Sequence, residues 1–405
     1  KNHHHSSDVI ATNFTPSPQD TFYMAVLTLN SRAQKFSILA LLTGVKVAKS
    51  SILSRHSHFA MVHIHSRRFH NQRGAFFGSG SDAMNDEFAR NTILGLIPKD
   101  AATNTTTSSS KPPSILYLGT PTYDLEGPRQ RQTSRFAELG CNISTIHISG
   151  DESTWNPSDP STRAKMVKES DVIVVSGGNT LYAIDQMNES GVSDLLQEAA
   201  LSGTVLTGGS AGAICWFDGG HSDSMDPDTF KEQMLRAAAQ QQDGTNGDES
   251  GPDFAIGKDE AKPWEYVRVP GLGFLPGLIC PHYDKVQSNG VLRSTDFNGM
   301  MLRHSGEIGI GIDHWAGLVI EDGEYRVVSF PDKPGSVLPD GSYDSDREGA
   351  PGVWRLEVLS TEEGNGGEVQ RSVVPAVGKV VDLLREATDI VPDVRCDMIR
   401  AANPR

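Results

Sequence analysis

Apolar runs of strand length alternate with helix-like segments through the middle of this chain, and this alternation limits the possible folds more than any other feature. The runs cover residues 114–120, 142–148, 171–175 and 203–207. The third is continuously hydrophobic, which is typical of a parallel strand buried on both faces. The pattern predicts an α/β fold with a doubly wound, mostly parallel sheet. Segments 316–320, 325–330 and 354–358 predict additional β structure towards the C-terminus.

The last of these central runs leads into a serine turn. Residues 208–213 read Gly-Gly-Ser-Ala-Gly-Ala, and a helix-compatible run follows. A strand, a sharp turn with serine at its apex and a helix together form the layout of a nucleophile elbow. The same letters also describe an ordinary turn between two elements. The interpretation of Ser210 as a nucleophile therefore depends on whether a base and oxyanion donors occur elsewhere in the chain.

A serine nucleophile needs a neighbouring base, and His282 is the best candidate. It follows the apolar run 277–280, so it lies at a predicted strand end, as Ser210 does. Ligands of a doubly wound sheet bind at the carboxyl ends of its strands. Gly177 and Gly178 also follow a central strand, where a backbone N–H group could serve an oxyanion hole. The other histidines considered in the body are His147, His221, His304 and His314.

These motifs, taken together, make the sequence similar to a known family. The strand and glycine turn of residues 171–180, the serine turn of residues 208–213 and Pro281-His282-Tyr283 occur in family order. They resemble peptidase family S51, which contains dipeptidase E and, more distantly, cyanophycinase. The resemblance covers residues 114–330. It implies a class I glutamine amidotransferase-like α/β sandwich, with serine in place of cysteine as the nucleophile.

The resemblance also implies roles for individual residues. Ser210 would be the nucleophile and His282 the base, with Gly178 and Ala211 as oxyanion donors and Asn179 near the substrate. Arg293 matches an arginine that is associated with an acidic N-terminal substrate residue. A planar guanidinium suits a carboxylate, although a surface arginine on a helix is an equally good interpretation.

The residue that orients the base is the open point of this comparison. The glutamate of the family's strand-end motif is replaced here by His314, and Asp313 stands beside it. Asp313 is the expected third member of the triad. The alternatives are Asp223, Asp226 and Glu321.

The expected function is that of a serine exopeptidase. It would hydrolyse dipeptides or short peptides with an N-terminal Asp through an acyl-enzyme, with no metal or cofactor. One alternative is a cyanophycinase-like hydrolase of β-linked Asp-Arg. Another is a non-catalytic, amidotransferase-like binding module, which gains weight if no carboxylate reaches His282.

Composition suggests how the chain is divided. Residues 21–81 contain no Asp or Glu and eight Lys or Arg, which is typical of a transit peptide or of a leader outside the fold. Residues 1–112 are therefore expected to be a leader, with a tag-like start and a polar linker. Residues 113–405 are expected to form the catalytic domain, with a polar insertion near residues 218–263.

Charge and cysteine content limit the partners. The formal net charge of −15 argues against nucleic acid, and no apolar run is long enough for a membrane span. The four cysteines have no C-x-x-C spacing, so a zinc site is not expected and a reducing compartment fits best. The expectation is a cytoplasmic enzyme of small peptides that could form a homodimer. A mitochondrial or plastid location is the alternative if the leader is a transit peptide.

Overall fold

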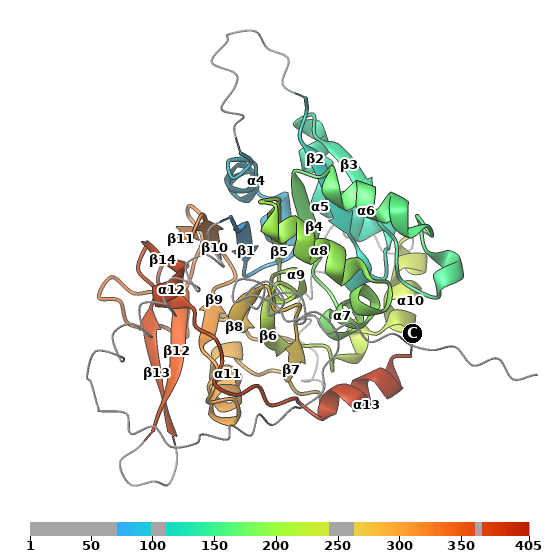
Figure 1. Cartoon of the computed structure of the whole chain (residues 1–405). Coiled ribbons are helices and arrows are strands. Elements are labelled where there is room, and N and C mark those ends of the chain that lie inside the picture. The colour runs from blue at the N-terminus through green and yellow to red at the C-terminus, as the bar shows by residue number, and fades with distance from the viewer. Residues whose placement is uncertain (1–70, 99–110, 243–262, 361–366, 405) are drawn as a thin grey trace, which may run out of the picture. The chain divides into compact units, whose positions relative to one another are not determined.

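The computed structural model of the chain describes residues 71–98, 111–242, 263–360 and 367–404. Its strands form two sheets, and one hydrophobic cluster contains residues from both (Figure 1). Most of the transit-like segment, the Thr/Ser linker and part of the predicted insertion lie outside the described residues. No described helix is both long and apolar enough to cross a bilayer.

The larger sheet has eight strands. They are β1 (Arg73–Phe77), β2 (Ser114–Leu118), β3 (Asn142–Thr145), β4 (Val172–Val175), β5 (Val205–Gly209), β10 (Ala316–Glu321), β11 (Glu324–Ser329) and β14 (Val377–Lys379). Their order is β14-β11-β10-β1-β5-β4-β2-β3. The neighbouring strands β1, β5, β4, β2 and β3 run parallel to one another. Strands β10, β11 and β14 continue the sheet beyond β1, each antiparallel to the strand before it.

The second sheet has six strands and follows the serine turn in the chain. They are β6 (Phe217–Ser222), β7 (Val267–Pro270), β8 (Leu275–Cys280), β9 (Gly309–Ile312), β12 (Val353–Ser360) and β13 (Gly367–Val373). Their order is β13-β12-β9-β8-β6-β7, with β6, β8 and β9 parallel to one another. The sequence patterns indicated C-terminal β structure but did not separate this sheet from the first.

Helices connect the parallel strands and cover the sheets. They are α3 (Ser81–Asn85), α4 (Glu87–Leu94), α5 (Glu126–Glu138), α6 (Pro160–Lys168), α7 (Thr180–Glu189), α8 (Val192–Leu201), α9 (Ala211–Ile214), α10 (Lys231–Gln242), α11 (Arg293–Arg303), α12 (Val380–Leu383) and α13 (Arg395–Ala402). The predicted α/β class is confirmed. The carboxyl ends of β4 and β5 meet at one edge, as their parallel pairing requires.

The predicted domain boundary is wrong, because residues before 113 form part of the fold. Strand β1 lies inside the larger sheet, paired in parallel with β5 and antiparallel with β10. Its residues Ala75, Phe76 and Phe77 are fully or almost fully buried. The acid-free composition concealed this strand, since a buried strand needs no charged residues. Leader and fold therefore cannot be divided at residue 112.

The predicted polar insertion near residues 218–263 also needs correction. Strand β6 lies between β8 and β7, so residues 217–222 belong to the second sheet. Helix α10 follows after a 3-10 turn, Pro227–Thr229. Two glycines make β6 look irregular in sequence. In the structure, a Cβ at Gly220 would overlap Ile214, so a close approach of α9 explains that glycine.

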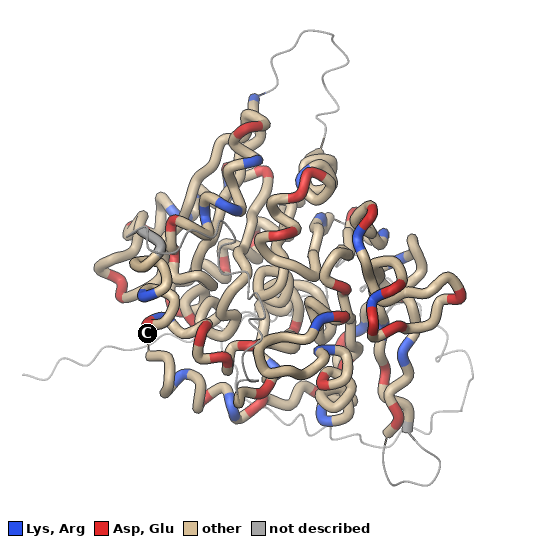
Figure 2. The backbone as a smooth tube through the Cα atoms, turned by 180° about the vertical axis from the view of Figure 1, so that it is seen from behind, with Lys and Arg blue, Asp and Glu red and all other residues tan. Residues whose placement is uncertain are grey.

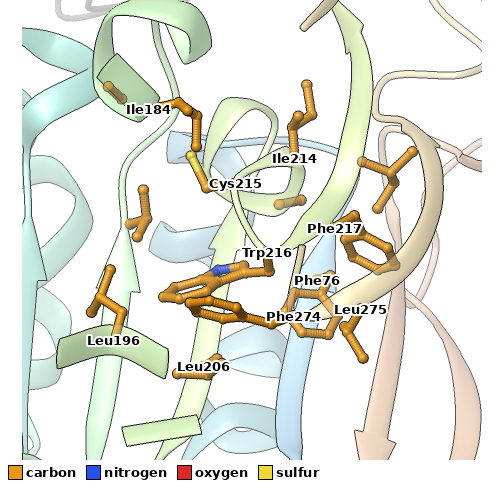
Figure 3. Packing of buried hydrophobic residues seen from close by; sticks show 14 of the residues in the cluster. Phe76, Ile184, Leu196, Leu206, Ile214, Cys215, Trp216, Phe217, Phe274 and Leu275 are labelled. Carbon is orange, nitrogen blue, oxygen red and sulfur yellow. The ribbon is translucent and has the colours of Figure 1, made fainter. Parts of the chain in front are cut away.

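The hydrophobic core lies behind the serine turn. Figure 3 shows Trp216 lying over Phe274, with Phe76 of β1 next to Phe217. The first pair of ring centroids is 5.9 Å apart, and the second pair meets edge to face at 5.3 Å. The Trp216 indole N–H donates to the carbonyl of Thr207 at 3.2 Å, so its polar atom is satisfied. This packing fixes α9, and hence the serine turn, against both sheets.

Candidate active site

Ser210 lies at the apex of the predicted strand, turn and helix. Strand β5 ends at Gly209 and α9 begins at Ala211, while Ser210 itself has φ 54° and ψ −123°. A non-glycine residue at positive φ is strained and must be held there by its surroundings. A Cβ at Gly209 would overlap the Ser79 carbonyl, and one at Gly212 would overlap β4. These glycines allow the close approach that holds the serine in its strained position.

The end of β1 holds the backbones of both candidate catalytic residues. The Ser210 N–H donates to the carbonyl of Phe77 at 3.2 Å, and the His282 N–H donates to the carbonyl of Gly78 at 3.1 Å. His282 follows β8 and has φ 49°. Ser210 and His282 line the same two cavities. The structure therefore brings the predicted nucleophile and base together through two successive residues of a segment that the sequence analysis had excluded.

His282 contacts a second imidazole, which in turn contacts a carboxylate. Its Nδ1 lies 2.8 Å from Nδ1 of His314, whose Nε2 lies 2.9 Å from Oδ2 of Asp82. The His314 backbone N–H also donates to Asp284 at 2.7 Å. His314 follows β9, and Asp82 lies in the first turn of α3. The group next to the base is thus an imidazole that is itself bound to a carboxylate.

The prediction of Asp313 as the partner of His282 is wrong. Its buried carboxylate accepts hydrogen bonds from the Ser336 hydroxyl and from the backbone N–H groups of Ser336 and Gly352, at 2.8–2.9 Å. Burial, together with the charge of Asp284, raises the pKa of Asp313 to about 7. In the turn between β9 and β10, the Asp313 side chain faces inward and His314 reaches His282.

The other carboxylates considered for this role bind elsewhere in the part of the chain that the structure describes. Asp223 is 3.7 Å from the guanidinium of Arg293. Asp226 accepts from Ser288, and Glu321 pairs with Arg73. Asp82 had not been considered, because it lay in the expected leader.

Burial keeps both imidazoles neutral at pH 7. It is the main reason that the pKa of His282 lies well below its usual value, and the neighbouring His314 lowers it further. Burial also lowers the pKa of His314, although the hydrogen bond to Asp82 opposes this effect. A neutral imidazole has one donor and one acceptor nitrogen, so His282 has a lone pair with which to act as a base.

Glycines surround the serine on the side where an oxyanion would form. A Cβ added at Gly80 or Gly177 would lie 3.6–3.7 Å from Cβ of Ser210, so both loops border the serine. Gly178 has φ 127°, and a Cβ there would overlap the Pro121 carbonyl. Ala211 is the first residue of α9, and N–H groups in a first turn have no acceptor within the helix. The roles of Gly178 and Ala211 as oxyanion donors remain predictions.

Ser210 lines two cavities. The larger has a volume of about 530 Å³ and the smaller about 260 Å³. They share Gly80, Gly178, Ser210, Thr229 and His282. A serine and a histidine that line two cavities leave space for a substrate next to both side chains. Within the described ranges, no group of three or more His, Cys, Asp or Glu side chains could hold a metal ion.

Asn179 lines the larger cavity, as expected for a residue near the substrate. Its side chain is nevertheless engaged within the protein. Oδ1 accepts from the Tyr182 N–H and caps α7, and Nδ2 donates to the Thr229 hydroxyl. Asn179 therefore joins the cavity wall to α7, and a direct contact with substrate remains a prediction.

Arg293 does not reach either cavity as the expected carboxylate fork. It is almost fully buried, and its guanidinium donates to the His221 carbonyl at 2.6 Å and to Gln287 at 3.0 Å. It also lies over the Tyr266 ring at 4.9 Å. Its partners Gln287 and Asp223 line the smaller cavity, so Arg293 supports the wall from behind. The prediction of direct substrate contact by Arg293 is not supported.

The segment 78–82 is the part of the site that sequence reasoning missed. It supplies Gly78, Gly80 and Asp82, each described above. Its sequence, Gly-Ser-Gly-Ser-Asp after an apolar run, repeats the strand-then-glycine pattern seen at Gly177 and Ser210. That pattern was the available signal, but the surrounding acid-free composition led to its exclusion.

A known family matches the central part of the chain. A family model described as peptidase family S51 matches residues 101–243, which include β2 to β5 and Ser210. This part of the chain is similar to peptidase family S51. The similarity supports a peptidase, a hydrolase of peptide bonds.

Two relatives match different shares of this chain. The uncharacterized peptidase YgaJ of Bacillus subtilis (strain 168) is 32% identical over 177 residues, or 44% of this chain and 57% of its own length. A Trypanosoma brucei brucei protein named G2/mitotic-specific cyclin-1 is 29% identical over 323 residues, or 78% of this chain and 88% of its own length. The serine and histidine geometry offers no support for a cell-cycle role.

A solved structure also matches this chain. It is a peptidase from an acI-B1 Actinobacterium, with 19% identity and a TM-score of 0.42. The match covers 64% of this chain and 88% of the other.

Proposed function

We propose that this protein is a serine exopeptidase that cleaves dipeptides or short peptides with an N-terminal Asp. The observation that carries the proposal is the pairing of Ser210 and His282 at the end of β1. A strained serine and a neutral histidine are anchored to adjacent carbonyl groups and open into the same cavities. A nucleophile next to a base, in a cavity bordered by backbone donors, is an arrangement suited to acyl transfer.

The proposed reaction has two steps. His282 takes the hydroxyl proton as Ser210 attacks the peptide carbonyl, and the oxyanion is stabilised by the N–H groups of Gly178 and Ala211. His282 then gives the proton to the leaving amine, which leaves an acyl-enzyme. Water activated by the same imidazole releases the acid and restores Ser210.

An acidic substrate residue would need a local cation. The chain has an excess of acidic residues, 51 against 36 Lys and Arg, and Figure 2 shows both signs interspersed over the described chain. Arg131, Arg236 and Lys285 line the two cavities. Arg236 pairs with Glu232, whereas Arg131 takes part in none of the ion pairs of the described residues. Arg131 is therefore the side chain best placed to bind a substrate carboxylate in the larger cavity.

The test compares the hydrolysis of Asp-Leu with that of Leu-Leu and of N-acetylated Asp-Leu. We expect Asp-Leu to be preferred and acetylation to abolish cleavage. Ser210→Ala should remove the activity, and activity that survived this substitution would contradict the mechanism. Arg131→Gln should raise KM for Asp-Leu but not for Leu-Leu, whereas Arg135→Gln, on an exposed face of the same helix, is the matched control.

Two further measurements separate the alternatives. Release of Asp-Arg from a β-linked polymer would indicate the cyanophycinase-like activity instead. A fluorophosphonate probe that fails to label Ser210 would indicate a binding module without catalysis.

A further inference from the structure

We propose that Asp82 and His314 are positioning residues that select the tautomer of His282 in which Nε2 is free to accept the serine proton. The inference deepens the proposed function and rests on it. It concerns two residues beyond the nucleophile and base, one of them from the segment before residue 113.

The first step is the assignment of protons on His314. An ionised carboxylate has only acceptors, so the atom of His314 that lies 2.9 Å from Oδ2 of Asp82 must carry hydrogen. That atom is Nε2. In a neutral imidazole the other nitrogen, Nδ1, then has a lone pair and accepts.

The second step transfers this choice to His282. The two Nδ1 atoms of His282 and His314 are 2.8 Å apart, a distance at which one must donate and the other accept. Because Nδ1 of His314 accepts, Nδ1 of His282 must donate. Nε2 of His282 is then unprotonated, which is the form that a general base for Ser210 requires.

The surroundings hold this chain of groups in one geometry. The backbone N–H of His314 donates to Asp284. The imidazole ring of His314 meets the Trp315 ring edge to face, with the centroids 4.7 Å apart. Asp82 lies in the first turn of α3, four residues after Gly78, whose carbonyl binds the His282 backbone. The rotations that would exchange donor and acceptor are therefore opposed by packing as well as by hydrogen bonds.

The arrangement also explains how the imidazolium formed during turnover is supported. When Nε2 of His282 takes the Ser210 proton, Nδ1 keeps its own and continues to donate to His314. The positive charge is thus stabilised by an imidazole that Asp82 polarises from its far side. No proton leaves His282 except the one that Nε2 passes to the leaving amine.

The experiment is a double-substitution series in the full-length chain. Asp82→Ala removes the acceptor that keeps hydrogen on Nε2 of His314, so His314 can present Nδ1–H to His282 and the wrong tautomer of the base becomes populated. We expect kcat to fall at least 10-fold, towards the roughly 10⁴-fold loss seen when a triad histidine takes the wrong tautomer, with KM little changed. Glu87→Ala, an exposed carboxylate in the next helix, is the matched control and should keep full activity.

Rescue separates positioning from a structural role. In the double variant Asp82→Ala with His314→Glu, a carboxylate at position 314 accepts directly from Nδ1 of His282, so Asp82 is no longer needed. We expect at least a 10-fold recovery of kcat over Asp82→Ala alone. A double variant that stays as slow as Asp82→Ala while unfolding in urea like the wild type would overturn the inference.

A spectroscopic measurement keeps this inference distinct from the proposed function. The ¹⁵N chemical shifts of the His282 ring report its tautomer without any substrate. We expect an unprotonated Nε2 in the wild type and a larger protonated fraction at Nε2 in Asp82→Ala. Wild-type activity lost in Ser210→Ala but unchanged in Asp82→Ala would refute the positioning role alone, whereas activity independent of Ser210 would refute the proposed function.

Discussion

Gly78 is the position at which a single methyl group tests the geometry of the site most directly. A Cβ on Gly78 would lie 2.0 Å from the carbonyl oxygen of Asp313, and real Cβ atoms do not approach other atoms within 3.0 Å. In Gly78→Ala the end of β1 must therefore move by about 1 Å. Three hydrogen bonds depend on this point, two that anchor Ser210 and His282 and one from the Gly78 N–H to Ala316, at 3.0–3.2 Å.

The magnitude follows from two separate effects. Overfilling a packed interior costs about 1–3 kcal/mol, and weakening these hydrogen bonds adds about 1 kcal/mol. We expect the free energy of unfolding to fall by about 2–4 kcal/mol. A misplacement of about 1 Å between reacting groups reduces the rate by about 10²-fold, so kcat should fall by a similar factor.

The assay is urea unfolding together with peptide hydrolysis, and the control is Gly299→Ala. Gly299 lies within α11, where an added Cβ would meet only the flexible end of Arg303 at 3.6 Å. The same chemical change should there stabilise the protein by about 1 kcal/mol. If Gly78→Ala kept both the wild-type urea midpoint and the wild-type kcat, the proposed anchoring by β1 would be refuted.

Two further predictions concern pH and strain. Because burial lowers the pKa of His282, kcat/KM should rise with pH to a plateau with a midpoint below 6.5. The folded chain binds a proton on His282 less tightly than the unfolded chain does. The same holds for His221, whose pKa burial lowers to about 4. Protonation of these histidines lowers the urea midpoint between pH 7 and pH 5, whereas Asp313, whose pKa burial raises to about 7, binds its proton more tightly in the folded chain and opposes that fall. A midpoint of kcat/KM at or above pH 6.5 would argue against a buried neutral His282. Ser210→Gly relieves the positive φ that Ser210→Ala retains, so it should be about 1 kcal/mol more stable than Ser210→Ala and equally inactive. A lower urea midpoint for Ser210→Gly than for Ser210→Ala would contradict the strain.

Local patterns predicted much of the larger sheet correctly. Continuous apolar runs gave β4 and the start of β5, because strands buried on both faces need hydrophobic residues throughout. The same reasoning missed β1, since its five residues lie in a segment whose composition suggested a leader. Its burial depends on β5 and β10, which lie more than a hundred residues away in the chain.

In the candidate active site, too, some residues were predicted from local patterns and others depend on tertiary contacts. Ser210 and the glycines around it were identified from sequence, because a tight turn after a strand has a local signature. The group that orients His282 had no such local signature. Asp313 and His314 are adjacent, and only the direction in which the chain leaves β9 decides which of them faces His282.

The sequence alone determined the α/β class, the serine turn and the strand end that carries His282, because each depends on a few neighbouring residues. Tertiary structure decided that β1 anchors the serine and histidine, that Arg293 stays behind the cavity wall and that Asp82 reaches His282 through His314. Contacts of this kind join residues up to 232 positions apart. Their energy depends on distance and direction in space, which a linear pattern does not record.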